Sequence, residues 1–245
     1  MKVIEGIDAV ILDIEGTTTP LDFVHKTLFQ FAKQNLHDFL NENINSENVR
    51  KALNELSKLY TDTVGKNTRS DLKSSATDDI SMENATSMLY HLIDMDSKAS
   101  QLKMIEGMIW EKGYRDGILR GEVYDDVPVC MKRWASEGKE IYIYSSGSIL
   151  AQKLIFSSTL YGDLTDYITN YFDTGIGRKN QAESYGKIAA AIGKDPERIL
   201  FISDSLIELN AAASKGFQTL MMDRDRKMNL NAYPGIISSL LEISI

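Results

Sequence analysis

The sequence has few of the features that stabilise secreted proteins or anchor membrane proteins. Its 245 residues contain one cysteine, Cys130, and four prolines. One cysteine cannot form an intramolecular disulfide or a cysteine-only metal cluster, so a reducing intracellular compartment is expected, with Cys130 as a buried thiol. No apolar run approaches the ~20 residues that a membrane-spanning helix needs, and the N-terminus does not have the pattern of a signal peptide. We therefore expect a cytoplasmic protein, with a nuclear location also open if the source is eukaryotic.

Positive charge is also scarce. The chain has 27 Lys and Arg against 35 Asp and Glu, which gives a formal net charge of -8 and a pI near 5.0. Nucleic acids and anionic lipids bind clustered basic side chains, so neither a nucleic-acid nor a membrane partner is expected. A few local cations can still bind an anionic ligand on an acidic protein. We expect a monomer whose partner is a small molecule.

Apolar residues make up 43% of the chain, which is enough for a sizeable core. Short apolar runs typical of strands buried on both faces alternate with helical patterns from about residue 125 onward, which predicts an α/β protein with a parallel sheet. The expected strands are Ala9–Leu12, Glu140–Ser145, Tyr171–Asp173, Arg198–Ser203 and Gln218–Met222. The expected helices of this region are Val129–Glu137, Ser148–Ser157, Ala182–Ile192 and Ile207–Lys215.

Residues 21–110 do not show this alternation. Their patterns are helical, and they are interrupted by a polar stretch, Thr61–Asp79, that we interpret as a solvated loop. Because the region follows the carboxyl end of the first strand, where ligands of parallel sheets bind, we expect it to be a helical cap. The predicted domains are an α/β core of residues 1–20 and 111–245 and a cap of residues 21–110. The expected cap helices are Phe23–Phe39, Val49–Tyr60, Met82–Asp94 and Ser97–Trp110.

Two carboxylates, Asp13 and Glu15, lie where the first strand gives way to a turn that contains Gly16. In an extended segment their spacing directs both side chains the same way. Two like charges at the end of a buried strand are unfavourable without compensation, and a divalent metal is the natural compensation. Taken alone, the pair is also compatible with an ordinary solvated turn.

Three further polar clusters occur at similar places. The strand ILFIS ends in Asp204, and Glu208 follows where the next helix begins. The strand EIYIY leads into Ser145 and Ser146, whose hydroxyls and neighbouring amides suit an anion at a helix N-terminus. Lys179 precedes the helix that leads into ILFIS. Because parallel strands end at one edge of a sheet, we expect these clusters and the carboxylate pair to form one site.

In this order, the four clusters resemble the haloacid dehalogenase superfamily of phosphohydrolases. Within it, ILDIEGTTTP resembles the signature of the enolase-phosphatases, also called acireductone synthases, which have Glu15 where most members of the superfamily have a second aspartate. Two departures are visible: Gln30 replaces an expected proline, and MMDRDRKMN lacks an Arg-Pro-Gly-Asn type of segment. The similarity covers nearly the whole chain and includes LDFVHKTLF, EGMIWEKGYRDG, DDVPVCMKRW, YSSGS, GRKNQAESYGKIA and ILFISDSLIELNAA.

The resemblance implies a Rossmann-like, haloacid dehalogenase-like core with a helical cap inserted after the first strand. It implies that Asp13 is a nucleophile that forms an aspartyl-phosphate and that Glu15 is the general acid and base. It also implies one Mg²⁺ per chain, held by Asp13, the backbone carbonyl of Glu15 and Asp204. The substrate-binding residues that it implies are Ser145, Ser146 and Lys179.

The reaction implied by the resemblance is that of methionine salvage. A bifunctional enolase-phosphatase converts 2,3-diketo-5-methylthiopentyl-1-phosphate to the acireductone 1,2-dihydroxy-3-keto-5-methylthiopentene and releases phosphate. The alternative is a generic Mg²⁺-dependent phosphatase of the haloacid dehalogenase type that acts on another small phosphorylated metabolite. The glutamate at position 15 and the similarity of the cap region favour the first.

Two roles stay open at the level of sequence. The base that enolises the substrate could be Glu15, His25 or Lys98. Glu208 could orient Lys179 or a metal-bound water, or it could be a helix-start acid stabilised by the helix dipole.

The sequence argues against two functions other than catalysis. A receiver-like signalling module would be much shorter and would have no cap directly after its phosphorylated strand. An inactive binding protein would be expected to have lost Asp13, Glu15, Lys179 or Asp204, and all four are present.

Overall fold

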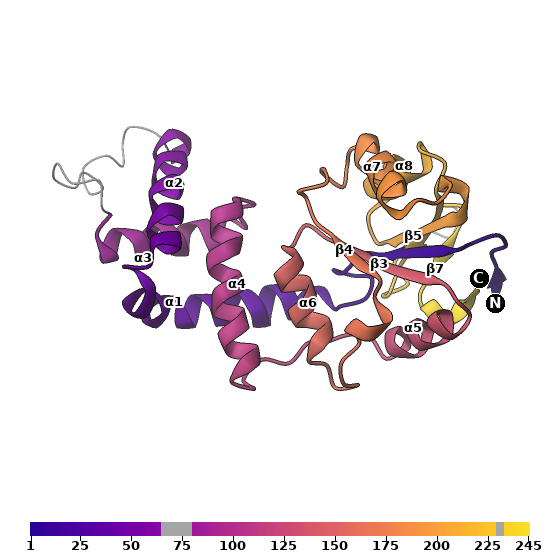
Figure 1. Cartoon of the computed structure of the whole chain (residues 1–245), viewed down its shortest axis with the longest axis horizontal. Coiled ribbons are helices and arrows are strands. Elements are labelled where there is room, and N and C mark those ends of the chain that lie inside the picture. Colours follow the sequence, from indigo (N-terminus) through magenta and orange to yellow (C-terminus); the bar gives the residue numbers. More distant parts are fainter. Residues whose placement is uncertain (65–79, 229–232) are drawn as a thin grey trace. The chain divides into compact units, whose positions relative to one another are not determined.

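A computed structural model of the chain describes residues 1–64, 80–228 and 233–245 (Figure 1). Residues 65–79, which make up most of the stretch that we interpret as a solvated loop, lie outside the described residues. The described residues divide into two compact units. An α/β unit comprises Met1–Val24 and Arg120–Ile245, and a helical unit comprises His25–Leu119.

Six strands of the described residues form one parallel sheet in the α/β unit. Their order is β4-β3-β2-β5-β6-β7, so β2 lies in the interior between β3 and β5. The sheet, with a helical segment inserted in the chain after β2, confirms the predicted fold class. The strands are β2 (Ala9–Leu12), β3 (Glu140–Tyr144), β4 (Asn170–Phe172), β5 (Ile199–Ser203), β6 (Gln218–Met222) and β7 (Ile236–Ile237).

The central strand is apolar along its whole length because helices cover both faces of the sheet. All four residues of β2 are buried. Alternate residues such as Ile11 and Phe201 face a core shared with α7 and α8. Figure 1 shows these two helices on one side of the strands and α5 on the other. The helices are α5 (Asp126–Ser136), α6 (Ile149–Ser157), α7 (Ala182–Ile192) and α8 (Leu206–Ala213).

Some short elements of the α/β unit were not expected from the sequence. The two-residue strand β7 extends the sheet beside β6. A separate pair, β1 (Lys2–Val3) and β8 (Ile243–Ser244), joins the two ends of the chain in parallel. Each of these strands is too short to show an alternating pattern.

The helical unit contains the four predicted helices, of which Met82–Asp94 has the predicted bounds and the other three have shifted ends. A π-helical segment, Phe23–Leu28, leads into the first of them, and the Trp110 indole donates to the Leu28 carbonyl at 2.8 Å. In the described part of the chain, no helix combines the length and apolar character that crossing a bilayer requires. The helices are α1 (Phe29–Asn43), α2 (Glu47–Val64), α3 (Met82–Asp94) and α4 (Ser100–Arg115).

The single cysteine packs inside the α/β unit. Cys130 is fully buried on α5 and forms no disulfide. Burial raises the pKa of its thiol to about 11, so the thiolate is scarce at neutral pH. The expectation of a buried thiol is confirmed.

Candidate active site

The Asp13 carboxylate is held at the carboxyl end of β2. Asp13 is only 5% exposed. The Ile14 amide donates to Oδ1 at 2.7 Å, and the Ser203 hydroxyl lies 2.9 Å from Oδ2. Because β5 pairs directly with β2, Ser203 at the end of β5 reaches Asp13 from a position 190 residues away in the sequence. The carboxylate is therefore fixed in position before any ligand binds.

A buried ammonium group bridges two carboxylates at this point. Lys179 Nζ lies 2.6 Å from Asp13 Oδ1 and 2.6 Å from Glu208 Oε2, and the Lys179 side chain is 9% exposed. Burial opposes its charge, but Asp13 and Glu208 outweigh burial, and the net effect raises the pKa of Lys179. Burial and the nearby Asp13 charge also raise the pKa of Glu208. Because two carboxylates share one ammonium group, the cluster is left with an excess of negative charge.

Asp204, which follows β5, lies against the turn after β2. Asp204 packs so tightly on Gly16 that a Cβ at position 16 would overlap its carboxylate. Although Asp204 is exposed at the residue level, desolvation of its carboxyl and the charges of Asp13 and Glu15 raise its pKa to about 6. Gly16 has φ +68, a left-handed conformation that glycine adopts without strain.

Replacing Gly16 with alanine tests this close approach. Gly16→Ala should lower the catalytic activity of this site about 10²-fold, because the new methyl group displaces Asp204 and the turn that carries Glu15. Gly193→Ala is the matched control. Gly193 has φ +73 at the end of α7 and open space around the Cβ position, so it should cost stability but not activity. Equal activity of the two variants would contradict the assigned role of Gly16.

The serine cluster lies on the neighbouring strand. Ser145 follows β3 directly, is buried, and accepts a hydrogen bond from the Gly147 amide at 3.1 Å. Ser148 caps α6 by accepting from the Ala151 amide. The half-buried Ser146 lies between them in this loop. The serines follow the end of a strand, as the sequence predicts, and the structure pairs that strand with the one that carries Asp13. Their binding roles stay predictions.

Comparison with known proteins places this site in a family. A family model described as haloacid dehalogenase-like hydrolase matches residues 7–216. Enolase-phosphatase E1 of Persephonella marina is 39% identical over 218 residues, which are 89% of this chain and 89% of the relative. Enolase-phosphatase E1 of Drosophila melanogaster is 38% identical over 217 residues, or 88% of this chain and 82% of the relative. This chain belongs to the enolase-phosphatase E1 family of haloacid dehalogenase-like hydrolases.

Solved structures support the fold of this enolase-phosphatase family member. The UTR4 protein of Saccharomyces cerevisiae superposes with a TM-score of 0.76 at 28% identity, and the match covers 96% of this chain and 98% of that one. A haloacid dehalogenase hydrolase of Bacillus subtilis, solved with bound magnesium, superposes with a TM-score of 0.58 at 13% identity, covering 97% of each chain. The second likeness is evidence for the fold alone.

Members of the haloacid dehalogenase superfamily are typically Mg²⁺-dependent, and the residues of this chain fit such an ion. Within the described ranges, no three His, Cys, Asp or Glu side chains cluster as a metal site. The expected ligand set needs only two carboxylates, Asp13 and Asp204, together with the Glu15 carbonyl. The overlap between Asp204 and a Cβ on Gly16 shows that this carboxylate lies against the backbone next to that carbonyl. Oxygen donors and an excess of negative charge suit a hard divalent cation.

The sequence did not identify two parts of the site in this enolase-phosphatase. Ser203 was predicted only as the end of a strand, because its contact with Asp13 depends on which strand pairs with β2. Arg224 lies in the segment that looked like a departure from the family. Its guanidinium contacts the turn after Asp13 through the Thr17 carbonyl, at 3.0 Å from Nε. No sequence pattern around Arg224 predicts that contact.

Two of the three candidate enolisation bases, His25 and Lys98, belong to the helical unit. His25 is exposed and meets the Phe29 ring edge-on at 5.5 Å. Lys98 is paired with Asp96 at 2.6 Å, and both side chains are substantially exposed. Neither environment marks a base, so the choice among Glu15, His25 and Lys98 stays open.

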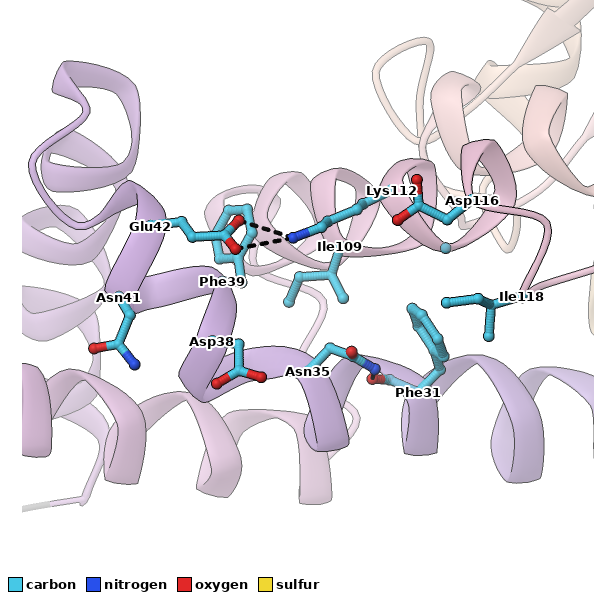
Figure 2. Close-up of a pocket in the computed structure, with 11 residues that line it drawn as sticks. Phe31, Asn35, Asp38, Phe39, Asn41, Glu42, Ile109, Lys112, Asp116 and Ile118 are labelled. Carbon is cyan, nitrogen blue, oxygen red and sulfur yellow. Dashed lines mark hydrogen bonds and ion pairs between the residues drawn. The ribbon is translucent and has the colours of Figure 1, made fainter.

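Each unit also contains a cavity. A cavity of about 570 Å³ in the α/β unit borders Gly16, Asp204, Tyr124 and Arg224. A cavity of about 280 Å³ in the helical unit has Phe31, Ile109 and Ile118 among its lining residues (Figure 2). Figure 2 shows the basic side chain among its lining residues, Lys112, paired with Glu42, at 2.8 and 3.1 Å. The first cavity is lined by Asp204, a predicted metal ligand, whereas the lining of the second includes no residue of the predicted catalytic, substrate-binding or metal set.

Proposed function

We propose that this protein is a Mg²⁺-dependent enolase-phosphatase that converts 2,3-diketo-5-methylthiopentyl-1-phosphate to the acireductone 1,2-dihydroxy-3-keto-5-methylthiopentene in methionine salvage. The observation that carries the phosphatase half is the Asp13 carboxylate, buried at a strand end and contacted by Ile14 N, Ser203 Oγ and Lys179 Nζ. The names of the relatives support the choice of substrate.

The proposed chemistry uses Asp13 and Glu15 in sequence. An Asp13 oxygen attacks phosphorus in line, the bond from phosphorus to the leaving oxygen breaks, and Glu15 gives that oxygen its proton. Water then attacks phosphorus and passes a proton to Glu15, which restores Asp13 and frees phosphate. Lys179 offsets the negative charge that accumulates when a phosphate approaches two carboxylates.

One Mg²⁺ per chain completes the proposal. Asp13, the Glu15 carbonyl and Asp204 would hold the ion, which would neutralise charge on the phosphoryl group when bound. Ser145 and Ser146 are proposed to bind the same phosphoryl group from the neighbouring strand. The helical unit, predicted from the sequence as residues 21–110, is proposed to act as a cap domain because it is inserted directly after the Asp13 strand. A cytoplasmic monomer is part of the proposal.

An ultraviolet assay with a parallel phosphate assay tests this function. With Mg²⁺ and the diketo phosphate, purified protein should produce an enol intermediate with its own absorbance, followed by free phosphate. Chelation of the metal with EDTA should stop phosphate release, and added Mg²⁺ should restore it. Release of phosphate without the intermediate, or equally from unrelated phosphomonoesters, would instead favour the generic phosphatase.

A further inference from the structure

The guanidinium of Arg224 lies inside the α/β unit, beside the turn that follows the nucleophile. Its side chain is 10% exposed. Nε donates to the Thr17 carbonyl at 3.0 Å, and Nη2 donates to the same oxygen at 2.5 Å. The guanidinium also stacks on the Tyr124 ring, 4.1 Å from its centroid. One backbone oxygen of the turn thus receives two charge-assisted hydrogen bonds.

Asp126 fixes the other side of this guanidinium. Arg224 Nη1 donates to Asp126 Oδ2 at 2.6 Å. The same oxygen accepts from the Ser239 hydroxyl at 2.6 Å and from the Leu240 amide at 2.7 Å. Burial opposes the charge of Asp126, but these donors, led by Arg224, lower its pKa overall. A carboxylate held by three donors leaves Arg224 little freedom to turn away from Thr17.

The contacted turn is the one that sets the geometry of the proposed acid and metal ligand. The amides of Thr17, Thr18 and Thr19 all donate to the Ile14 carbonyl, at 3.2, 2.9 and 2.9 Å. Thr17 lies two residues after Glu15, so a shift of its carbonyl is transmitted through Gly16 to the Glu15 carbonyl. Asp204 also packs against this turn, at Gly16. The turn is therefore contacted by Asp204 at Gly16 and by Arg224 at Thr17.

We propose that Arg224 is a positioning residue of this enzyme, which holds the turn 14–19 so that Glu15 keeps its place relative to Asp13 and the metal. The inference rests on the proposed phosphatase function. The fork geometry matters because a guanidinium can serve Thr17 and Asp126 at once through separate N–H groups. A lysine ammonium keeps the charge but is a point donor on a flexible stem, so it cannot reproduce both contacts.

Arg224→Lys is the direct test. Its kcat should fall about tenfold or more, while KM for the phosphorylated substrate changes less than about twofold, because binding groups on other strands are untouched. The Mg²⁺ concentration for half-maximal activity should rise about tenfold, the order seen when a partner of a metal ligand is lost. In metal-free protein, amide hydrogen exchange of the segment 13–20 should be faster than in the wild type.

Arg198→Lys is the matched control. Arg198 also forms a two-bonded ion pair, with Asp8, but it lies before β5 at the opposite end of the strands. Arg198→Lys should leave kcat, Mg²⁺ dependence and amide exchange of the segment 13–20 unchanged.

If Arg224→Lys does not fold, Asp126→Asn replaces it as the test variant, because it weakens the contact that holds Arg224 while keeping the guanidinium. It should give the same pattern with smaller changes.

The outcomes separate this inference from the proposed function. A wild-type protein without phosphatase activity would refute the proposed function, while faster exchange of the segment 13–20 in Arg224→Lys would still show the hold on the turn. An active wild type with a folded Arg224→Lys variant of unchanged kcat and Mg²⁺ dependence would refute the positioning role. A loss of thermal stability without those kinetic changes would equally refute it, since that result describes a purely structural ion pair.

Discussion

Asp13→Asn is expected to lower phosphate release about 10³-fold or more, the order lost when a nucleophile is removed. The amide cannot attack phosphorus, but it matches the carboxylate in shape and can still accept from the Ile14 amide. The fold should therefore survive. Enolisation should persist, since it needs a base and not the nucleophile. The measurement is the pair of assays that follow the enol absorbance and free phosphate separately.

Asp8→Asn is the control for this variant. Asp8 lies at the other end of the same strand and pairs with Arg198. Its replacement should leave both half-reactions at the wild-type rate. Phosphate release by Asp13→Asn at the wild-type rate would remove Asp13 from the role of nucleophile.

Lys179→Met is expected to lower activity strongly and also to destabilise the fold. Without the ammonium, the Asp13 and Glu208 carboxylates remain buried without their shared cation. Breaking a buried ion pair in this way costs about 3–5 kcal/mol of unfolding free energy. Phosphate release should fall about 10²-fold or more, because the charge opposite the transferring phosphoryl group is lost. Thermal unfolding and steady-state kinetics measure the two effects.

A second substitution separates stability from catalysis. Lys179→Met combined with Glu208→Gln removes one of the two buried carboxylates left without a cation, so the double variant should regain part of the lost stability but no activity. Lys194→Met is the control, because Lys194 pairs with Glu140 at 2.9 Å on the surface and should have little effect on either measurement. Activity of the double variant near the wild-type level would show that Lys179 only neutralises Glu208.

The strands that carry the site were predictable because burial on both faces leaves an unmistakable pattern. Ala9–Leu12 and Gln218–Met222 are strands with the predicted bounds. Helix α7 also begins and ends as predicted, since Gly193 stops it in a left-handed conformation. Helix α4 begins at Ser100 and runs to Arg115, later than predicted at both ends, because no strong cap marks either end of the pattern.

Contacts that depend on the sheet order could not be predicted in the same way. The Ser203 contact with Asp13 exists only because β5 is the neighbour of β2, and helical connections leave that choice open. The Arg224 contact with Asp126 joins residues 98 positions apart, and no spacing along the chain predicts that they meet. The sequence thus predicts which residues end the strands, while the structure decides which of them meet.

The long separation between Asp13 and its partners also bears on synthesis of the protein. Asp13 leaves the ribosome before Lys179, Ser203 and Glu208, and 190 residues separate it from Ser203. Until β5 is made, the apolar strand β2 lacks its interior neighbour and is a segment that chaperones would bind. We expect truncated chains that end before α8 to be inactive and prone to aggregate, so activity arises only after α8 has been synthesised.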